Sequence, residues 1–225
     1  MGHFLSITVN EKLYIKDPQS SELGQKIVHN GILLIDEIGF ENFTFRRLAL
    51  KIESTEASVY RYFENKQKFL TYLLNWYWEW LDFRLSNSII NIKDPKKRMT
   101  VMLMVLIDAA KKDLEVPYVD EDILHKIVIV EGTKAYHNKF VDEQNSEGFF
   151  AAYKSVSERI AQGLLDINPK YPYPRSTASM IIENAFNTLY FSEHLPRLTD
   201  IKNDQKDQSD DLLQMLEFYV QKLLV

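Results

Sequence analysis

Residues 44–66 read Thr-Phe-Arg-Arg-Leu-Ala-Leu-Lys-Ile-Glu-Ser-Thr-Glu-Ala-Ser-Val-Tyr-Arg-Tyr-Phe-Glu-Asn-Lys, and this pattern predicts two short helices joined by a tight turn. Thr44 and Thr55 are good N-cap residues, each placed just before a segment whose apolar residues lie four apart. Val59 and Phe63 have this spacing in the second helix, so they share one buried face. A pair of this size cannot bury a core by itself, and we expect the rest of the chain to support it.

The second helix leaves small, hydroxyl, aromatic and cationic side chains for its outer or flanking surface. Such a mixture suits contact with base edges and phosphates, and a helix of this kind can enter the major groove of DNA. Lys66 opens the next helix, where its ammonium and the nearby N–H groups could hold a phosphate. By periodicity alone, a structural helical hairpin with exposed cations is at least as good an interpretation.

The stretch resembles the helix-turn-helix signature of the TetR family of transcriptional regulators, over about 50 of the 225 residues. One departure lies in the turn, where Glu53 and Ser54 replace the usual glycine and apolar residue, and a non-glycine residue with positive φ is strained. Upstream, residues 39–43 match the usual glycine-aromatic link. The residues that match the signature are Thr44, Arg46, Leu48, Ala49, Ser58, Val59, Tyr60, Tyr62, Phe63 and Lys66.

The resemblance implies a DNA-binding surface with two groups of residues. We expect Glu56, Ala57 and Ser58 to face base edges, with Arg46 as a guanine reader. The residues that should mainly position phosphates are Thr55, Tyr60, Tyr62 and Lys66. The full predicted set is Thr44, Arg46, Thr55, Glu56, Ala57, Ser58, Tyr60, Arg61, Tyr62 and Lys66.

Composition favours a helical protein of a reducing compartment. Glycine and proline number seven each, and the chain has no cysteine, which excludes disulfides and thiolate metal sites. The start of the chain lacks the features of a signal peptide, and no run of about 18 apolar residues indicates a membrane span. We therefore expect a cytoplasmic protein with no metal and no cofactor.

The net charge of −5 is unevenly distributed. Residues 44–70 carry six cations and three acids, so +3, whereas residues 71–225 carry 18 cations and 23 acids, so −5. This local basic footprint fits a DNA-binding head on an acidic body.

The fold predicted from these patterns is all-α with about nine helices. An N-terminal arm (1–19) precedes a three-helix helix-turn-helix domain (20–65), and a larger helical effector-binding and dimerisation domain (66–225) follows. Residues 4–16 could form a short strand or an arm, and packing on the protein itself or its partner is favoured over insertion into DNA. Besides the two helices of residues 44–66, we expect a helix that starts at 17–21 and closes at Gly39, and helices over 66–91, 95–114, 121–138, 145–166, 175–194 and 208–224.

The family resemblance also implies an effector pocket in the helical body. Glu131, on an otherwise apolar helix, would suit a ligand amine or hydroxyl, although a solvent-facing position is an equal alternative. His125 reads better as a surface or satisfied core histidine. For each residue proposed to line the pocket, the alternative is a position in the hydrophobic core without contact to a ligand. The candidates are Trp76, Trp80, Phe83, Met102, Leu106, Ile127, Glu131, Phe149, Tyr153 and Phe186.

The last two helices are expected to form a homodimer through a four-helix bundle, with capping of the monomer core as the alternative. Two-fold symmetry then predicts a palindromic operator. The candidate interface residues are Ile181, Ile182, Ala185, Leu189, Leu212, Leu216, Tyr219 and Leu223.

These observations together predict a repressor that binds duplex DNA as a homodimer and is released by a small-molecule effector. An enzyme is disfavoured because no nucleophile, dinucleotide, phosphate-loop or metalloprotease motif occurs. The alternative is a helical binding or scaffold protein with a degenerate DNA-binding head, which only the departure at Glu53-Ser54 supports.

Overall fold

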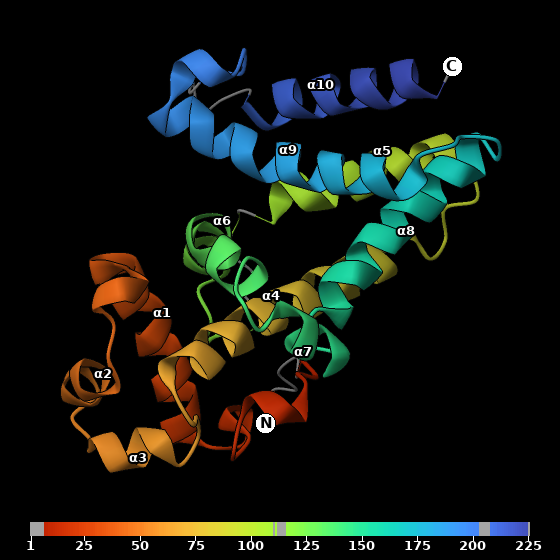
Figure 1. The fold of residues 1–225 in the computed structure, drawn as a ribbon. Helices are drawn as coiled ribbons and strands as arrows, with labels where there is room; N and C mark the ends of the chain where they lie inside the picture. Colours follow the sequence, from red (N-terminus) through yellow and green to blue (C-terminus); the bar gives the residue numbers. More distant parts are fainter. Residues whose placement is uncertain (1–6, 110, 112–115, 203–207, 225) are drawn as a thin grey trace. The chain divides into compact units, whose positions relative to one another are not determined.

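Helices form all the regular structure among the residues that the computed structural model describes, which are 7–109, 111, 116–202 and 208–224. The all-α prediction is therefore confirmed. Short 3₁₀ turns occur at Glu11–Leu13, Pro18–Ser20 and Pro196–Leu198. The α-helices, labelled in Figure 1, are α1 (Glu22–Asn42), α2 (Phe45–Lys51), α3 (Glu56–Tyr60), α4 (Lys66–Ile89), α5 (Pro95–Asp108), α6 (Glu121–Tyr136), α7 (Val141–Ser146), α8 (Ala151–Ile167), α9 (Pro174–His194) and α10 (Gln208–Leu223).

The helix that the sequence analysis missed is α7. A single helix was expected from 145, but Gly148 takes a positive φ of 83° between α7 and α8. A left-handed residue ends a helix, so α8 starts anew at Ala151. The end predicted for α5, at 114, lies outside the described residues, and the described helix ends at Asp108.

The chain divides into two compact units by its internal contacts. Unit 1 comprises Met1–Trp80 and Ala110–Ala152, and unit 2 comprises Leu81–Ala109 and Tyr153–Val225. Unit 1 thus holds α1–α3, the first part of α4, α6 and α7. The functional division at residues 65 and 66 stays a prediction.

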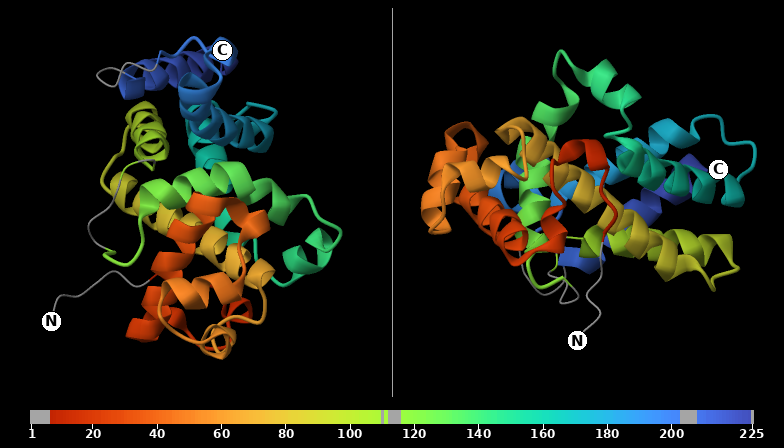
Figure 2. Two further views of the ribbon diagram at one scale, coloured as in Figure 1. Left: turned by 90° about the vertical axis from the view of Figure 1, so that its left-hand side faces the viewer. Right: turned by 90° about the horizontal axis from the view of Figure 1, so that it is seen from below.

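In unit 1, α1 and α4 approach closely because Gly31 has no side chain. A Cβ at this position would lie 2.3 Å from the ring of Phe69, so the ring fills the space of the missing side chain. Phe69 stacks on Phe43 and meets the edge of Phe63, with ring centroids 5.4 and 4.9 Å apart. These rings form an aromatic core beneath α2 and α3. On its other side, α1 lies along α6 (Figure 2).

Gly39 ends the regular part of α1, as predicted, with φ 74° and ψ 154°. The helical assignment nevertheless runs on to Asn42, because a further short turn follows the kink. A glycine is needed here because the left-handed region is unfavourable for other residues. The kink sets the direction of the chain into α2.

The N-terminal segment packs on its own unit. Ile7, Val9 and Leu13 are buried, and the described part of the segment contains no strand. The backbone N–H of Asn10 donates to Asn75 Oδ1 in α4 (3.2 Å), and Asn10 Nδ2 donates to the carbonyl of Glu147 (2.9 Å). Residues 7, 9 and 13 thus pack on unit 1, and the preference for packing over DNA insertion stays a prediction.

Unit 2 consists of the last part of α4 with α5, most of α8, α9 and α10. α10 packs on α5 and α9 through its buried residues Leu212, Leu216 and Val220. Arg159 of α8 binds Asp82 of α4 with two hydrogen bonds, of 2.9 and 3.1 Å. No helix within the described ranges is long and apolar enough to cross a membrane.

Candidate nucleic-acid interface

The turn between α2 and α3 is built by local side-chain and backbone chemistry. Thr44 Oγ1 accepts a hydrogen bond from Arg47 N, and Thr55 Oγ1 accepts one from Ser58 N, both at 3.2 Å. Both predicted N-caps are therefore present. Each satisfies an N–H that the first turn of its helix would otherwise leave without a partner.

Glu53 takes the position that glycine usually holds in this turn. Its φ is 54°, and it is the one non-glycine residue with positive φ in the described part of the chain. Ser54 N donates to Ala49 O (2.9 Å) and Glu53 N donates to Leu50 O (3.2 Å), which is the hydrogen-bond pattern of a Schellman motif. The turn thus keeps the geometry that glycine normally supplies, at a cost of about 1 kcal/mol for the glutamate.

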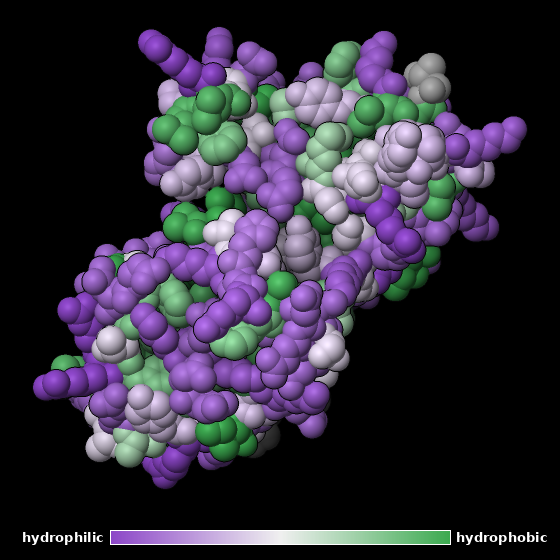
Figure 3. Space-filling model, viewed as in Figure 1, coloured by the Kyte–Doolittle hydropathy of each residue, from purple (hydrophilic) through white to green (hydrophobic). Residues whose placement is uncertain are grey.

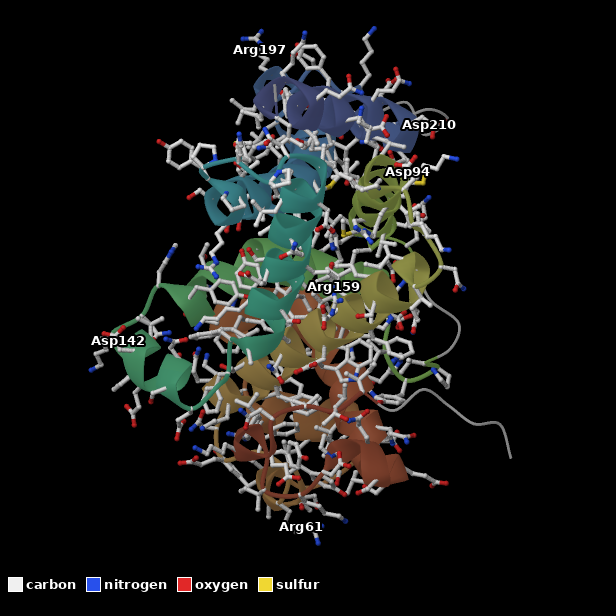
Figure 4. All side chains as sticks on the ribbon, turned by 90° about the vertical axis from the view of Figure 1, so that its right-hand side faces the viewer. Arg61, Asp94, Asp142, Arg159, Arg197 and Asp210 are labelled. Atoms are coloured by element: carbon white, nitrogen blue, oxygen red, sulfur yellow. The ribbon has the colours of Figure 1, made fainter. Side chains whose placement is uncertain are left out.

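Most of the predicted DNA-contacting side chains are exposed around this turn. Exposed are Thr44, Arg46, Thr55, Glu56, Ala57, Tyr60 and Arg61. Figure 3 shows mostly hydrophilic residues over the visible face of α1–α3. In Figure 4 the Arg61 side chain points outward from the ribbon. The surface is therefore polar and open to a charged partner.

Ser58 and Tyr62 lie inside the unit, which corrects their assignment to the surface. Ser58 is 9% exposed, and its Oγ receives a hydrogen bond from Arg61 Nη2 (3.1 Å). Tyr62 is 3% exposed, and its hydroxyl lies 2.8 Å from Ser21 Oγ at the start of α1. Ser58 therefore orients Arg61, and Tyr62 anchors α1. The role of Tyr62 could not be seen in the α3 pattern because Ser21 is distant in sequence, whereas Arg61 lies three residues after Ser58 and was a local signal.

Lys66 also has a partner that the sequence analysis missed. Its Nζ donates to the carbonyls of Phe40 (3.2 Å) and Glu41 (3.1 Å), and lies 4.8 Å from the centre of the Phe40 ring. These carbonyls belong to the last turn of α1, where a cation satisfies acceptors and suits the helix dipole. Lys66 thus holds the end of α1 in this structure, in place of the predicted phosphate contact.

Arg46 is the most available cation of residues 44–70. Arg47 donates to the carbonyl of Asn42 (3.0 Å), and Lys51 lies 2.8 Å from a carboxylate oxygen of Glu37. Arg46 is exposed and makes no such contact with the described residues. A guanidinium of this kind can bind guanine or phosphate with two hydrogen bonds.

Glu131 joins α6 to the kink of α1, which corrects its assignment to an effector pocket. The side chain is buried, and its Oε1 accepts a hydrogen bond from Phe40 N (3.2 Å). Lys134 Nζ lies 2.7 Å from Glu131 and 2.8 Å from Glu41. The hydrogen bonds to Glu131 and then Glu41 raise the pKa of Lys134 above its usual value. The i, i+3 spacing of Glu131 and Lys134 was the available signal for an ion pair.

His125 is a core histidine, as the sequence analysis favoured. Its Nδ1 lies 2.5 Å from the hydroxyl of Tyr77, and burial lowers its pKa to about 4. The ring is therefore neutral at pH 7.

The other predicted pocket residues are distributed over both units. Phe83 is 41% exposed, so it does not line an interior pocket. Tyr153 is half-buried and donates to Glu183 (3.2 Å); burial and this carboxylate raise the pKa of the phenol. The remaining candidates are buried. Those in unit 1 are Trp76, Trp80, Ile127 and Phe149, and those in unit 2 are Met102, Leu106 and Phe186.

Most of the predicted dimer residues are buried within the single chain, which corrects their role as the main contact. Leu189 and Tyr219 are half-buried, and Leu223 is exposed. Apolar residues that do reach the surface of α9 and α10 include Met180 and Phe218, the latter 55% exposed. The buried residues are Ile181, Ile182, Ala185, Leu212 and Leu216.

The comparisons with known proteins relate the N-terminal part of the chain to one family. Residues 27–73 match the model of the bacterial regulatory proteins of the tetR family, a span that contains α2, α3 and the turn between them. This segment therefore resembles the DNA-binding domain of the TetR family. The chain as a whole has the all-helical fold of solved structures from that family. No curated protein matches the sequence.

Solved structures share this TetR-family fold at low sequence identity. A tetR-family regulatory protein from Rhodococcus RHA1 superposes with a TM-score of 0.66 at 10% identity, over 89% of this chain and 97% of that one. The regulator FadR from Bacillus subtilis, in complex with stearoyl-CoA, superposes with a TM-score of 0.61 at 15% identity, over 88% of this chain and 96% of that one. AibR, in complex with isovaleryl coenzyme A and operator DNA, superposes with a TM-score of 0.61 at 13% identity, over 84% of this chain and 95% of that one.

The described residues contain no group of three or more histidine, aspartate or glutamate side chains placed to hold a metal ion.

Proposed function

We propose that this protein is a transcriptional repressor that binds a palindromic operator as a homodimer and leaves it when a small molecule binds the helical body. The observation that carries the proposal is the α2–α3 turn. Its Schellman geometry, two N-caps and exposed Arg46, Glu56 and Ala57 lie within the part of the chain that matches the TetR-family model.

The bound molecules of two similar structures support operator binding and ligand control. AibR is bound to operator DNA and isovaleryl coenzyme A, and FadR to stearoyl-CoA. We infer the same division of labour for this chain, with no enzymatic step and with cytoplasmic DNA as the target.

The dimer proposed here uses the outer faces of α9 and α10. Their buried stripe is already used within the chain, so the contact must come from exposed residues such as Met180, Phe218 and Leu223. A two-fold axis would place two copies of α3 to read two half-sites in successive turns of the DNA major groove.

Selection of binding sites from a random duplex library tests the proposal. Purified protein should enrich a palindrome, and binding to it should weaken steeply with salt. Failure to enrich any sequence at low salt, with protein shown to be folded, would favour the scaffold function with a degenerate head, to which the strained Glu53 points.

Variants of two exposed residues then separate the contacts. Arg46→Ala should weaken operator binding by about 1–3 kcal/mol and change the preferred base if it reads guanine, or lower the salt slope by about one if it binds phosphate. Glu56→Gln should alter the sequence preference more than the overall affinity. Arg47→Ala is the matched control for Arg46, because Arg47 is already bonded to Asn42.

A further inference from the structure

A groove in unit 2 lies apart from every residue that the sequence analysis assigned to an effector. Its volume is about 500 Å³, which is within the range of small-molecule sites. One wall is the start of α5 and the other is the end of α10. Both walls belong to the same compact unit.

The floor of the groove is apolar and firmly packed. Met99 and Leu103 of α5 and Val220 of α10 line it, and all three are buried. Met99 also meets Gly163 of α8, where a Cβ would lie 3.0 Å from the methionine methyl group. Ile167 and Leu224, which also line the groove, are half-buried, so a hydrocarbon chain or ring would bind against them by burial of apolar surface.

One carboxylate stands on the wall above this floor. Glu217 is half-buried, and its Oε1 accepts a hydrogen bond from the hydroxyl of Thr100 on the opposite wall. That bond fixes the position of the carboxylate. No lysine, arginine or histidine of the described residues lies within 4.0 Å of it as an ion-pair partner.

The cation at the edge of the groove is less well placed to recognise a ligand. Lys96 lines the groove but is exposed, so water solvates its ammonium. A fixed, half-buried carboxylate gains more from an added opposite charge than a solvated lysine does, because its surroundings screen the interaction less. The charge of the groove therefore complements a cation.

We propose that this groove binds an amphiphilic organic cation. Its apolar chain lies against Ile167 and Leu224, above the buried floor, and its ammonium group donates to Glu217. This ligand class deepens the proposed function, since such a molecule would be the effector of the regulator. Binding to the groove is measured without DNA, so it stands or falls separately from operator recognition.

Three ligands with the same ten-carbon chain test the charge preference on the full-length protein. They are decylammonium, 1-decanol and decanoate, titrated calorimetrically below their aggregation limits. We expect decylammonium to bind at least tenfold more tightly than decanol, and decanoate to bind most weakly. Equal affinities, a preference for decanoate, or no binding of decylammonium would overturn the proposal.

Variants locate the site. Glu217→Gln should remove the tenfold advantage of decylammonium while leaving the affinity for decanol unchanged. Glu193→Gln, at an exposed glutamate of α9, is the matched control and should change neither. Gln221→Phe should fill the groove and weaken both ligands together. Retention of the full advantage in folded Glu217→Gln, confirmed by its thermal unfolding, would show that the ammonium binds elsewhere and would overturn the assignment.

Discussion

Unit 1 and unit 2 differ in the polar contacts that each of them contains. In unit 1, side chains repeatedly bond to backbone atoms of distant segments, as Asn75 does to Phe149, Glu131 to Phe40 and Lys66 to Phe40. Between the described helices of unit 2, side chains bond to one another, as Arg159 does to Asp82, and Asn168 donates to the carbonyl of Leu224.

This difference bears on what each unit does. A bond to the backbone fixes the path of the chain, whereas a pair of long side chains can follow a helix that shifts. Unit 1 must present a five-residue helix, α3, at a defined angle, so fixed backbone positions suit it. Unit 2 joins its helices by apolar stripes and side-chain pairs, which suits a body that adjusts around a ligand.

Asn75→Leu should give the largest effect on this comparison. Asn75 is 2% exposed, and its loss leaves the N–H of Asn10 and the carbonyl of Phe149 without their partner. We expect a loss of about 2–4 kcal/mol in the free energy of unfolding, measured with urea. Asn30→Leu is the control, because the Asn30 amide bonds one turn back in its own helix. Similar losses in both variants would show that bonds to distant backbone contribute nothing special.

Acidification should weaken unit 1 through His125. Burial lowers its pKa from the ordinary 6.5 to about 4 in the folded protein, so between these pH values the unfolded chain binds a proton that the folded chain does not. Stability from this residue is present above pH 6.5 and is lost as the pH falls toward 4, by about 2 kcal/mol at pH 5.

The check is the difference between wild type and His125→Gln in urea unfolding at pH 7 and pH 5. The variant should lose less stability than wild type over this interval. His194→Gln, at a histidine that is half exposed, should behave as wild type. A parallel pH dependence in all three proteins would contradict the burial argument.

Asp82→Ala should have a smaller effect, in unit 2. The carboxylate accepts bonds from Arg159 and Ser155 but retains 19% exposure of its side chain. Water therefore partly replaces the lost contacts, and we expect about 1 kcal/mol less stability. Glu158→Ala removes the fully exposed pair with Arg175 and should leave the urea midpoint unchanged. A loss from Asp82→Ala as large as that from Asn75→Leu would remove the contrast between the units.

Glu53→Gly should give the smallest effect, and a gain. Glycine removes the strain of φ 54° but adds freedom to the unfolded chain, so the net stabilisation is about 0.5–1 kcal/mol. Glu64→Gly, at a nearby exposed glutamate without positive φ, should destabilise slightly. A loss of stability in Glu53→Gly would mean that the glutamate side chain makes a compensating contact.

The sequence correctly predicted those features of the fold that a few neighbouring residues determine. Thr44 and Thr55 as caps and Gly39 as a helix end each follow from a few neighbouring residues. The all-helical fold follows from periodicity. Tyr62 and Lys66 could not be assigned in this way, because their partners are Ser21 and the last turn of α1, and a local pattern does not show which tertiary contacts form. Ser58 was missed although its partner Arg61 lies only three residues away.

The apolar stripes show a second limit. Leu212 and Leu216 have the spacing of an interface, but the same spacing is produced by packing on α5 and α9 within one chain. Periodicity identifies a buried face and does not say whose surface covers it. The groove beside Glu217 was missed for the same reason, since it depends on how α5 and α10 meet.

The bonds of Asn10 and Asn75 to residues 147 and 149 have a consequence for engineered regulators. A hybrid that transplants residues 1–65 onto another effector-binding body would leave behind Asn75, Glu131 and the 147–149 turn, and so would lose the groups that hold its N-terminal segment and α1. A transplantable head has to include residues 110–152 as well as 1–80. The compact unit that contains α2 and α3 is therefore formed by two separate segments of the sequence.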